Sequence, residues 1–290
     1  MSVFLQLNTI FISILIEAFP FVLIGVFVAG FIQMFISEEM VAKVVPKNRF
    51  LAVLYGTLIG ALFPACECGI VPIVRRLLLK GVPLHTAIPF MLTGPIINPV
   101  VLFSTYIAFG NQWDMVLYRG GLSLVVALLI GILLSYQFKG NELLKKAAHT
   151  HSHQPASQTI SKKFIHMLRH AVDEFFSVGK YLIIGAFIAA SMQTFLKTST
   201  LIELGQTEAT SSLVMMGLAY ILSLCSEADA FVASSFRGTF STGALVAFLV
   251  FGPMVDIKNM LMMLSVFNKR FVFSLIGSIA LFVFLGSLLL

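Results

Sequence analysis

Long stretches of this chain carry no charged side chain. Asp, Glu, Lys and Arg are absent from residues 81–113, 120–138, 209–226, 238–255 and 271–290. A helix that crosses a bilayer needs about 20 mostly apolar residues. The hydrophobic pattern predicts eight such segments, at about 10–34, 51–74, 84–109, 116–137, 176–197, 211–235, 241–266 and 271–290. We therefore expect an all-α polytopic membrane protein of about eight transmembrane helices.

The composition excludes a water-soluble globular protein. Charged residues make up 11% of the chain and hydrophobic residues 58%, whereas a soluble domain is about 25% charged. A soluble chain this apolar would expose large apolar patches to water. Three cysteines in a lipid-embedded chain predict no disulfide framework. The first apolar segment has no basic start and is long enough to span, so we expect no cleavable signal peptide.

One long polar stretch, residues 139–172, separates a first transmembrane unit (1–138) from a second (173–290). It holds five of the six histidines and six basic residues, Lys139, Lys145, Lys146, Lys162, Lys163 and Arg169. Positive charge accumulates in cytoplasmic loops, so we expect this linker in the cytoplasm of a bacterial cell. Counting eight spans outward places both termini there too. Lys269 and Arg270 fall on the opposite side in this count and disagree with it.

The basic linker has two further interpretations. Its His149, His151 and His153 alternate along the chain, so their imidazoles share a face only if the chain is extended, and a solvated linker is the simpler interpretation. The net charge of +6 is attributed to topology and lipid headgroup contact. Nucleic-acid binding is not expected, because the basic residues lie on no folded domain.

The two units match each other at an offset of 160 residues. Residues 25–29 and Gln33 correspond to residues 185–189 and Gln193, and Glu67 corresponds to Glu227. These matches predict two four-helix repeats, with chance alignment of apolar sequence as the alternative. Units with an even number of spans run parallel, about an axis along the membrane normal. A re-entrant segment would change that arrangement.

Helix-breaking residues interrupt the predicted spans at similar places in both units. Proline removes an amide donor and glycine loosens the turn, which hydrocarbon tolerates only where protein or water satisfies the freed groups. Transporters built from repeats place their sites at such interruptions near mid-membrane. The breaks are predicted at Pro64, Gly69, Pro72, Gly94, Pro95, Pro99, Gly252 and Pro253. Either a broken helix or a re-entrant loop fits residues 66–72.

Ionisable side chains inside the apolar spans form the candidate site. Each costs about 2.5–3.5 kcal/mol to insert, so such residues mark functional positions. The acids are Glu17, Glu67, Glu227, Asp229 and Asp256, and Asn98 and Cys225 lie at the same breaks. Desolvation favours the protonated form of a carboxyl group, which suits a proton-coupled carrier. The alternative is a structural role, in which the acids cap broken helix ends or pair with a base such as Lys258.

Cys66 and Cys68 flank Glu67 at a spacing that depends on the backbone. Residues two apart point away from each other on a helix but share a side in an extended stretch. In an unwound segment the two thiols and the carboxylate would form a soft, anionic site for a thiophilic metal or metalloid. Small buried thiols that only fill space are the alternative.

Two motifs, FPACECGIVPIVRRLLLKGVP and TGPIINPVV, resemble the YraQ/YcgR-type predicted permeases, a bacterial inner-membrane family related to the organoarsenical efflux permease ArsP. The segments CSEADAFVASSF and FGPMVDIKNMLMM also look like this family. The resemblance implies a plasma-membrane permease of about eight helices, beside a second membrane subunit. It places the family motif on Cys66, Glu67, Cys68, Gly69, Pro72, Pro95, Asn98, Pro99, Cys225, Glu227, Asp229, Pro253 and Asp256. Trivalent arsenic would fit the thiols by analogy.

The sequence leaves two main hypotheses about function. The first is a secondary permease that moves a small ion or a metal or metalloid species through a site between the repeats, without a cofactor. The second is a membrane subunit of a two-component metal-handling complex that is inactive without its partner. We do not expect an enzyme, because G-x-x-x-x-G-K-[ST], H-E-x-x-H and a nucleophile–base pair are all missing from the sequence.

Overall fold

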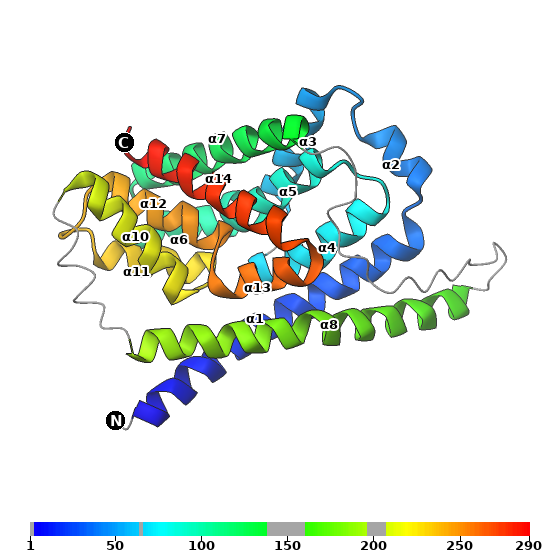
Figure 1. The fold of residues 1–290 in the computed structure, drawn as a ribbon, viewed down its shortest axis with the longest axis horizontal. Helices are drawn as coiled ribbons and strands as arrows, with labels where there is room; N and C mark the ends of the chain where they lie inside the picture. The colour runs from blue at the N-terminus through cyan, green and yellow to red at the C-terminus, as the bar shows by residue number, and fades with distance from the viewer. Residues whose placement is uncertain (1–2, 64–65, 138–159, 196–206) are drawn as a thin grey trace.

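The computed structural model describes residues 3–63, 66–137, 160–195 and 207–290. These residues form helices and no strand (Figure 1). In the first unit the helices are α1 (Val3–Phe35), α2 (Glu38–Val44), α3 (Arg49–Leu62), α4 (Glu67–Leu79), α5 (Leu84–Ile97), α6 (Pro99–Ala108) and α7 (Trp113–Gln137). In the second they are α8 (Ile160–Phe195), α10 (Glu208–Leu222), α11 (Ser226–Ser235), α12 (Thr242–Met254), α13 (Ile257–Val266) and α14 (Lys269–Ser287).

Six segments of the described chain are long and apolar enough to cross a membrane. They are Val3–Phe35, Leu84–Ala108, Trp113–Gln137, Ala171–Phe195, Thr242–Val266 and Lys269–Ser287. Each corresponds to one of the eight predicted spans. The other two predicted spans, 51–74 and 211–235, are divided into the short helices α3–α4 and α10–α11. Both of these helix pairs lie beside a span that is itself broken, α5–α6 or α12–α13.

The breaks follow from the local sequence. Asn98 ends α5 and caps α6, where its side chain accepts a hydrogen bond from the Val101 amide, and Pro99 takes the first helical position, which needs no donor. Asp256 caps α13 in the same way, through the Asn259 amide at 2.6 Å. Cys66 and Cys225 occupy the N-caps of α4 and α11. Pro64 lies outside the described residues.

The α3–α4 pair turns back inside the protein. Helix α3 runs beside α5 in the same direction, because Gly56 contacts the Thr86 carbonyl and, one turn later, Gly60 contacts the Phe90 carbonyl. A short turn, residues 80–83, joins the end of α4 to the start of α5. The end of α4 therefore lies at the same side as the start of α3. Helices α3 and α4 form a re-entrant helical hairpin rather than a transmembrane span.

The α10–α11 pair repeats this arrangement from the opposite side. Helix α10 runs along α12, and at its end the Ser223 hydroxyl accepts a hydrogen bond of 3.2 Å from the Ile257 amide, at the α12–α13 break. Residues 236–241 then join α11 to the start of α12. This second hairpin opens where α6 ends, since Arg237 donates a hydrogen bond to the Phe109 carbonyl at 3.3 Å. The structure thus has six candidate spans and two hairpins where the sequence predicts eight spans.

The hairpins change the positions of the chain ends. The start of α8 lies at the right of Figure 1, and both termini lie at the left. The end of α7 lies beside the start of α3, where Arg49 donates a hydrogen bond to the Ser135 carbonyl at 3.3 Å. The sequence-based count places the termini and the linker on one side, and it does so because it treats each hairpin as a full crossing. Helix α8 begins at Ile160, so residues 160–172 of the predicted linker are helical. Residues 138–159, with His149, His151 and His153, lie outside the described residues.

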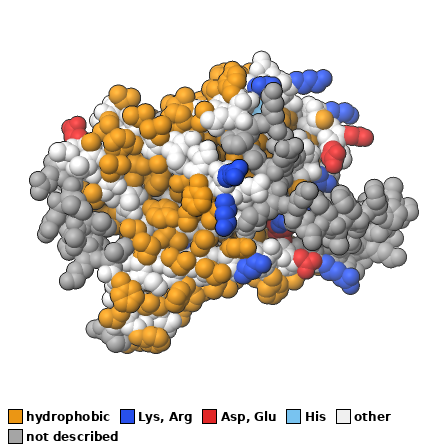
Figure 2. All heavy atoms as spheres, in the orientation of Figure 1, with side chains coloured by type: hydrophobic (Ala, Val, Ile, Leu, Met, Phe, Trp, Pro, Cys, Tyr) orange, Lys and Arg blue, Asp and Glu red, His pale blue; other side chains and the backbone are white. Residues whose placement is uncertain are grey.

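Side-chain burial is consistent with a bilayer as the solvent. Helix α12 is buried from Gly243 to Met254 and forms the centre of the molecule, whereas many Phe, Leu and Ile side chains of α1 and α8 are exposed. Figure 2 shows apolar side chains spread across one face, with the Lys and Arg side chains in its middle and right-hand parts, toward the linker side. The exposed apolar surface is of the kind that lipid covers.

Candidate functional site

A small pocket lies where the tips of both hairpins meet α1 and α13. Its lining includes Glu17 from α1, Cys66, Glu67 and Cys68 at the start of α4, Cys225 at the start of α11 and Lys258 from α13. Its volume is about 10 Å³, close to the smallest that holds one water molecule. The pocket therefore draws on both units, and it contains all three cysteines of the chain.

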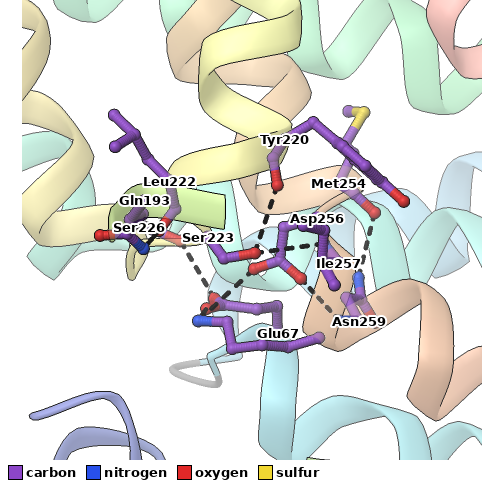
Figure 3. A network of polar contacts seen from close by, with 11 residues as sticks. Glu67, Gln193, Tyr220, Leu222, Ser223, Ser226, Met254, Asp256, Ile257 and Asn259 are labelled. Carbon is purple, nitrogen blue, oxygen red and sulfur yellow. Dashed lines mark hydrogen bonds and ion pairs between the residues drawn. The ribbon is translucent and has the colours of Figure 1, made fainter. Parts of the chain in front are cut away.

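A buried ionic cluster forms the inner wall of this pocket (Figure 3). The Lys258 ammonium lies 3.5 Å from an Asp256 oxygen and 3.8 Å from a Glu67 oxygen, and each of these side chains is at most 3% exposed. The other Glu67 oxygen faces the Ser226 hydroxyl at 3.5 Å. Lys258 thus pairs with the acids rather than marking the end of a span. The cluster joins α4 and α13, which lie almost 200 residues apart.

Four half-helices begin inside the protein rather than at its surface. They are α4, α6, α11 and α13, and α4 contacts α13 while α6 contacts α11. The free amides and the dipole of a helix N-terminus favour nearby negative charge. Glu67 in the first turn of α4 and Asp256 at the N-cap of α13 are stabilised by these free amides and dipoles. The breaks therefore help to hold buried carboxylates that hydrocarbon alone would exclude.

Two further buried charged side chains lie close by, Arg119 on α7 and Asp229 on α11. The Arg119 side chain is fully buried and donates hydrogen bonds to the Thr105 hydroxyl at 2.6 Å and to the Ser226 carbonyl at 3.0 Å. Asp229, which is 1% exposed, has no hydrogen-bond partner for either oxygen within the described part of the chain. Arg119 is the strongest charged influence on Asp229, yet the two make no ion pair in this structure.

Comparison with known proteins gives one family for this chain. Residues 3–290 match the model of a family described as "Predicted permease". The chain belongs to this predicted permease family. A permease of this family with several apolar helices is a multi-pass membrane protein. The resemblance to YraQ/YcgR-type permeases in the sequence motifs is confirmed.

Two curated relatives cover almost all of this chain, and a third covers part of it. The chain is 69% identical over 288 residues to a protein named YcgR from Bacillus subtilis, which is 99% of this chain and 98% of the relative. It is 47% identical over 285 residues to a Streptococcus mutans protein named "Putative two-component membrane permease complex subunit", 98% of this chain and 95% of that one. It is 27% identical over 110 residues, 38% of this chain, to a protein named YraQ from Escherichia coli, covering 31% of that relative. No solved structure matches the chain.

The predicted site residues of the permease fall into two groups. Glu17, Cys66, Glu67, Cys68 and Cys225 line the pocket, and Asp256 joins it through Lys258. The others lie apart from it. Both polar atoms of Asn98 are used within its own break, Glu227 is half-buried on the first turn of α11, and Asp229 packs against α12.

Close contacts, one with backbone and one with a side chain, explain two of the predicted glycines. A Cβ on Gly69 would lie 2.7 Å from the Phe21 carbonyl, so a glycine here lets α1 approach the first turn of α4. A Cβ on Gly252 would lie 3.0 Å from an Asp229 oxygen. Gly94 faces the Ile70 side chain, while Pro72, Pro95 and Pro253 lie inside α4, α5 and α12. Gly69, Pro72, Gly94, Pro95, Gly252 and Pro253 were predicted as break positions, and that prediction is wrong in detail, because all six lie within helices. The interruptions come a few residues away, at Asn98 and at residues 255–256.

The thiols do not form a complete metal site by themselves. Cys66 is extended at the N-cap of α4, whereas Cys68 lies in the first helical turn, and both still line the pocket. Across the described ranges, no group of three or more His, Cys, Asp or Glu side chains is placed to hold a metal ion.

The sequence analysis missed Arg119. The predicted span 116–137 includes this arginine close to its first residue, where a basic side chain can reach the lipid headgroups, but α7 begins at Trp113 and buries it completely. The sequence does contain an indication of its burial. Arg119 directly precedes the uncharged residues 120–138, and an arginine inside a span is as costly to insert as the acids Glu67 and Asp229. Its partners, Thr105 and the Ser226 carbonyl, carried no such signal.

Proposed function

We propose that this protein is a secondary permease that moves a small ion or a metal or metalloid species through the pocket at the hairpin tips. The observation that supports it most is the convergence of costly residues from both units on one pocket. Glu67 and Lys258 come from different units, and Cys66, Cys68 and Cys225 face the same space. Buried charges in a membrane protein line substrate or ion pathways.

We further propose that the two units are inverted repeats. Each contains one long helix, a re-entrant hairpin, a broken span and a last span, in that order. Three spans per unit reverse the second copy relative to the first. Inverted repeats with sites on discontinuous helices are the architecture of many alternating-access transporters. In this arrangement one hairpin reaches the pocket from each side of the membrane, so that each side has its own route to it.

The same topology gives an orientation that accounts for the basic residues. On the linker side lie Lys43, Lys47, Arg49, Arg75, Arg76, Lys80, Lys269 and Arg270. The opposite side has Arg237. By the positive-inside rule the linker faces the cytoplasm and both termini face outward. Lys269 and Arg270 no longer disagree with the other charges.

A fusion to the C-terminus tests this orientation. Alkaline phosphatase, which is active only outside the cytoplasm, is expected to be active when joined after Leu290. Green fluorescent protein at the same position is expected to stay dark. The matched control places each reporter after Lys80, at the turn between α4 and α5, where the results should be reversed. Fluorescence at Leu290 would contradict the proposed topology.

The charge of the carboxylates and the polarizability of the thiols suggest a role for each group in the pocket. Glu67 and Asp256 share Lys258 as an internal cation, so an arriving cation can replace the ammonium without leaving the carboxylates unpaired. Cys66, Cys68 and Cys225 add polarizable sulfur, which selects thiophilic species over hard ions. The pocket as described is nearly closed, and transport therefore requires the hairpins or α1 to move.

Transport in proteoliposomes tests the proposal, after growth of a deletion strain on a panel of metals and arsenicals has identified a substrate. Glu67→Gln and Cys66→Ser are each expected to lower the initial rate at least about tenfold, which corresponds to roughly 1.4 kcal/mol. Glu208→Gln, an exposed acid at the start of α10, is the matched control and should keep the wild-type rate. Wild-type rates in both pocket variants would refute the site.

The alternative is a subunit that works only in a complex. It is favoured by the name of the Streptococcus mutans relative, which describes that protein as a subunit of a two-component membrane permease complex. The basic stretch 139–172 would be a docking surface for the second subunit. Purifying this chain alone and together with a candidate second membrane subunit distinguishes the two proposed functions. A lone chain that is stable and transports would exclude the alternative.

A further inference from the structure

Asp229 is the buried acid that the pocket does not explain. It lies in the first turn of α11, points away from the pocket lining and is 1% exposed. Neither carboxylate oxygen has a hydrogen-bond partner among the residues that the structure describes. An ionised carboxylate in such a place costs several kcal/mol unless a charge or a donor compensates it. Something must therefore neutralise this group.

The surroundings of Asp229 leave little room for a ligand. A Cβ on Gly252 of α12 would lie 3.0 Å from one carboxylate oxygen, and it would lie 3.3 Å from the Ala219 methyl group of α10. A metal ion such as Na⁺ or Ca²⁺ needs several oxygen ligands around it. Here the neighbouring surfaces are a glycine and an alanine. Even a methyl group on Gly252 would make a tight contact, so the carboxylate packs closely against α12 on this side.

The charges that face Asp229 also disfavour a metal cation. They are Arg119 from α7, Glu67 from α4, and Lys258 and Asp256 at the start of α13. Glu227 lies two residues earlier on its own helix. Arg119 has the largest influence of these, and its positive charge would repel a bound metal ion. A proton, by contrast, removes the negative charge and needs no further ligand.

We propose that Asp229 is the proton-binding site of this permease and is separate from the Glu67–Lys258–Asp256 cluster. The inference rests on the proposed transport function and names its coupling ion. When the proton leaves, the Arg119 guanidinium is the group that can turn to the new carboxylate. Its Nε atom has no partner in the described chain, while its other nitrogens hold Thr105 and the Ser226 carbonyl.

This exchange of partners would connect the proton to the substrate pocket. Ser226 is the residue whose carbonyl accepts from Arg119 and whose hydroxyl faces Glu67 at 3.5 Å. A guanidinium that moves from Ser226 to Asp229 releases the start of α11, which lies at the tip of the second hairpin. Loss of the proton and rearrangement of the pocket are thus coupled through one arginine.

Infrared spectroscopy of the purified, lipid-reconstituted protein tests the proposal without any transport. The wild type at neutral pH is expected to show the C=O stretch of a protonated carboxylic acid in a nonpolar environment. Asp229→Asn should remove one acid's share of this band. Glu227→Gln, two residues away and half-buried, is the matched control and should leave the band unchanged.

A second variant covers the case in which Asp229→Asn does not fold. Asp229→Glu keeps the acid, so it should keep the band and shift its frequency. A band that is the same in the wild type and in both Asp229 variants would overturn the proton site. A wild type that shows the band but transports none of the tested substrates would refute the proposed function and leave the proton site intact.

Discussion

Replacing Lys258 with methionine is expected to destabilise the protein by about 3–5 kcal/mol, the typical cost of removing one partner of a buried ion pair. The side chains of Glu67 and Asp256 are 1% exposed, so neither can turn to water when the ammonium is lost. The measurement is thermal unfolding in detergent, followed by the recovery of monodisperse protein. Methionine keeps the length and apolar stem of lysine, so the change tests the charge rather than the packing.

Two further variants make the Lys258 result specific. Lys269→Met alters an exposed lysine at the start of α14 and should leave the unfolding temperature unchanged. Lys258→Met combined with Glu67→Gln removes one of the uncompensated acids and should recover part of the lost stability. Equal stability of Lys258→Met and the wild type would show that the cluster is not an interacting ionic unit.

Gly25→Ala is expected to cost about 1–3 kcal/mol through overpacking. A methyl group on Gly25 would collide with the Gly69 carbonyl and lie 2.7 Å from its Cα, so α1 must move away from the first turn of α4. Backbone atoms cannot rotate aside as a side chain can. Because the pocket lies at this contact, we also expect transport to fall together with stability.

Gly179→Ala is the matched control for Gly25→Ala. Gly179 lies inside α8, and a Cβ built there meets nothing within 4 Å. Alanine should be neutral or stabilising by up to about 1 kcal/mol, because it favours the helix more than glycine does. Thermal unfolding of the two variants is compared in the same detergent. Similar losses in both would mean that helix propensity, and not the α1–α4 contact, governs the effect.

The helix breaks were predictable because their causes are local. Pro99 needs no donor at the first position of α6, and Asn98 and Asp256 are N-cap residues that accept a hydrogen bond from the backbone amide three residues later. Pro72, Pro95 and Pro253, in contrast, lie inside helices, so proline alone did not fix the break positions. The pocket acids Glu17 and Glu67 were predictable from cost alone, since the bilayer penalises every charge. Cys66 and Cys68 were selected by their spacing, and the structure places both at one pocket.

The direction of the chain after each break was not predictable in this way. Residues 51–74 are apolar enough for a span, and nothing in their pattern distinguishes a crossing from a hairpin. The packing of α3 along α5 decides it, since Gly56 and Gly60 let the two backbones touch. Each unit therefore has three candidate spans rather than the four that the sequence predicts. An odd number of spans inverts the second unit relative to the first, and it places the termini on the side opposite to the linker.

The sequence by itself determined that the protein lives in a membrane, where its helices break and which acids are costly, because each of these depends on short-range chemistry and on the bilayer as solvent. Only the tertiary structure decided that both hairpins turn back, that Lys258 lies between Glu67 and Asp256, and that Arg119 is buried against Thr105 and the Ser226 carbonyl. Those facts depend on which helix faces meet across almost 200 residues of chain. Contacts of that kind are set by packing, and no local pattern records them.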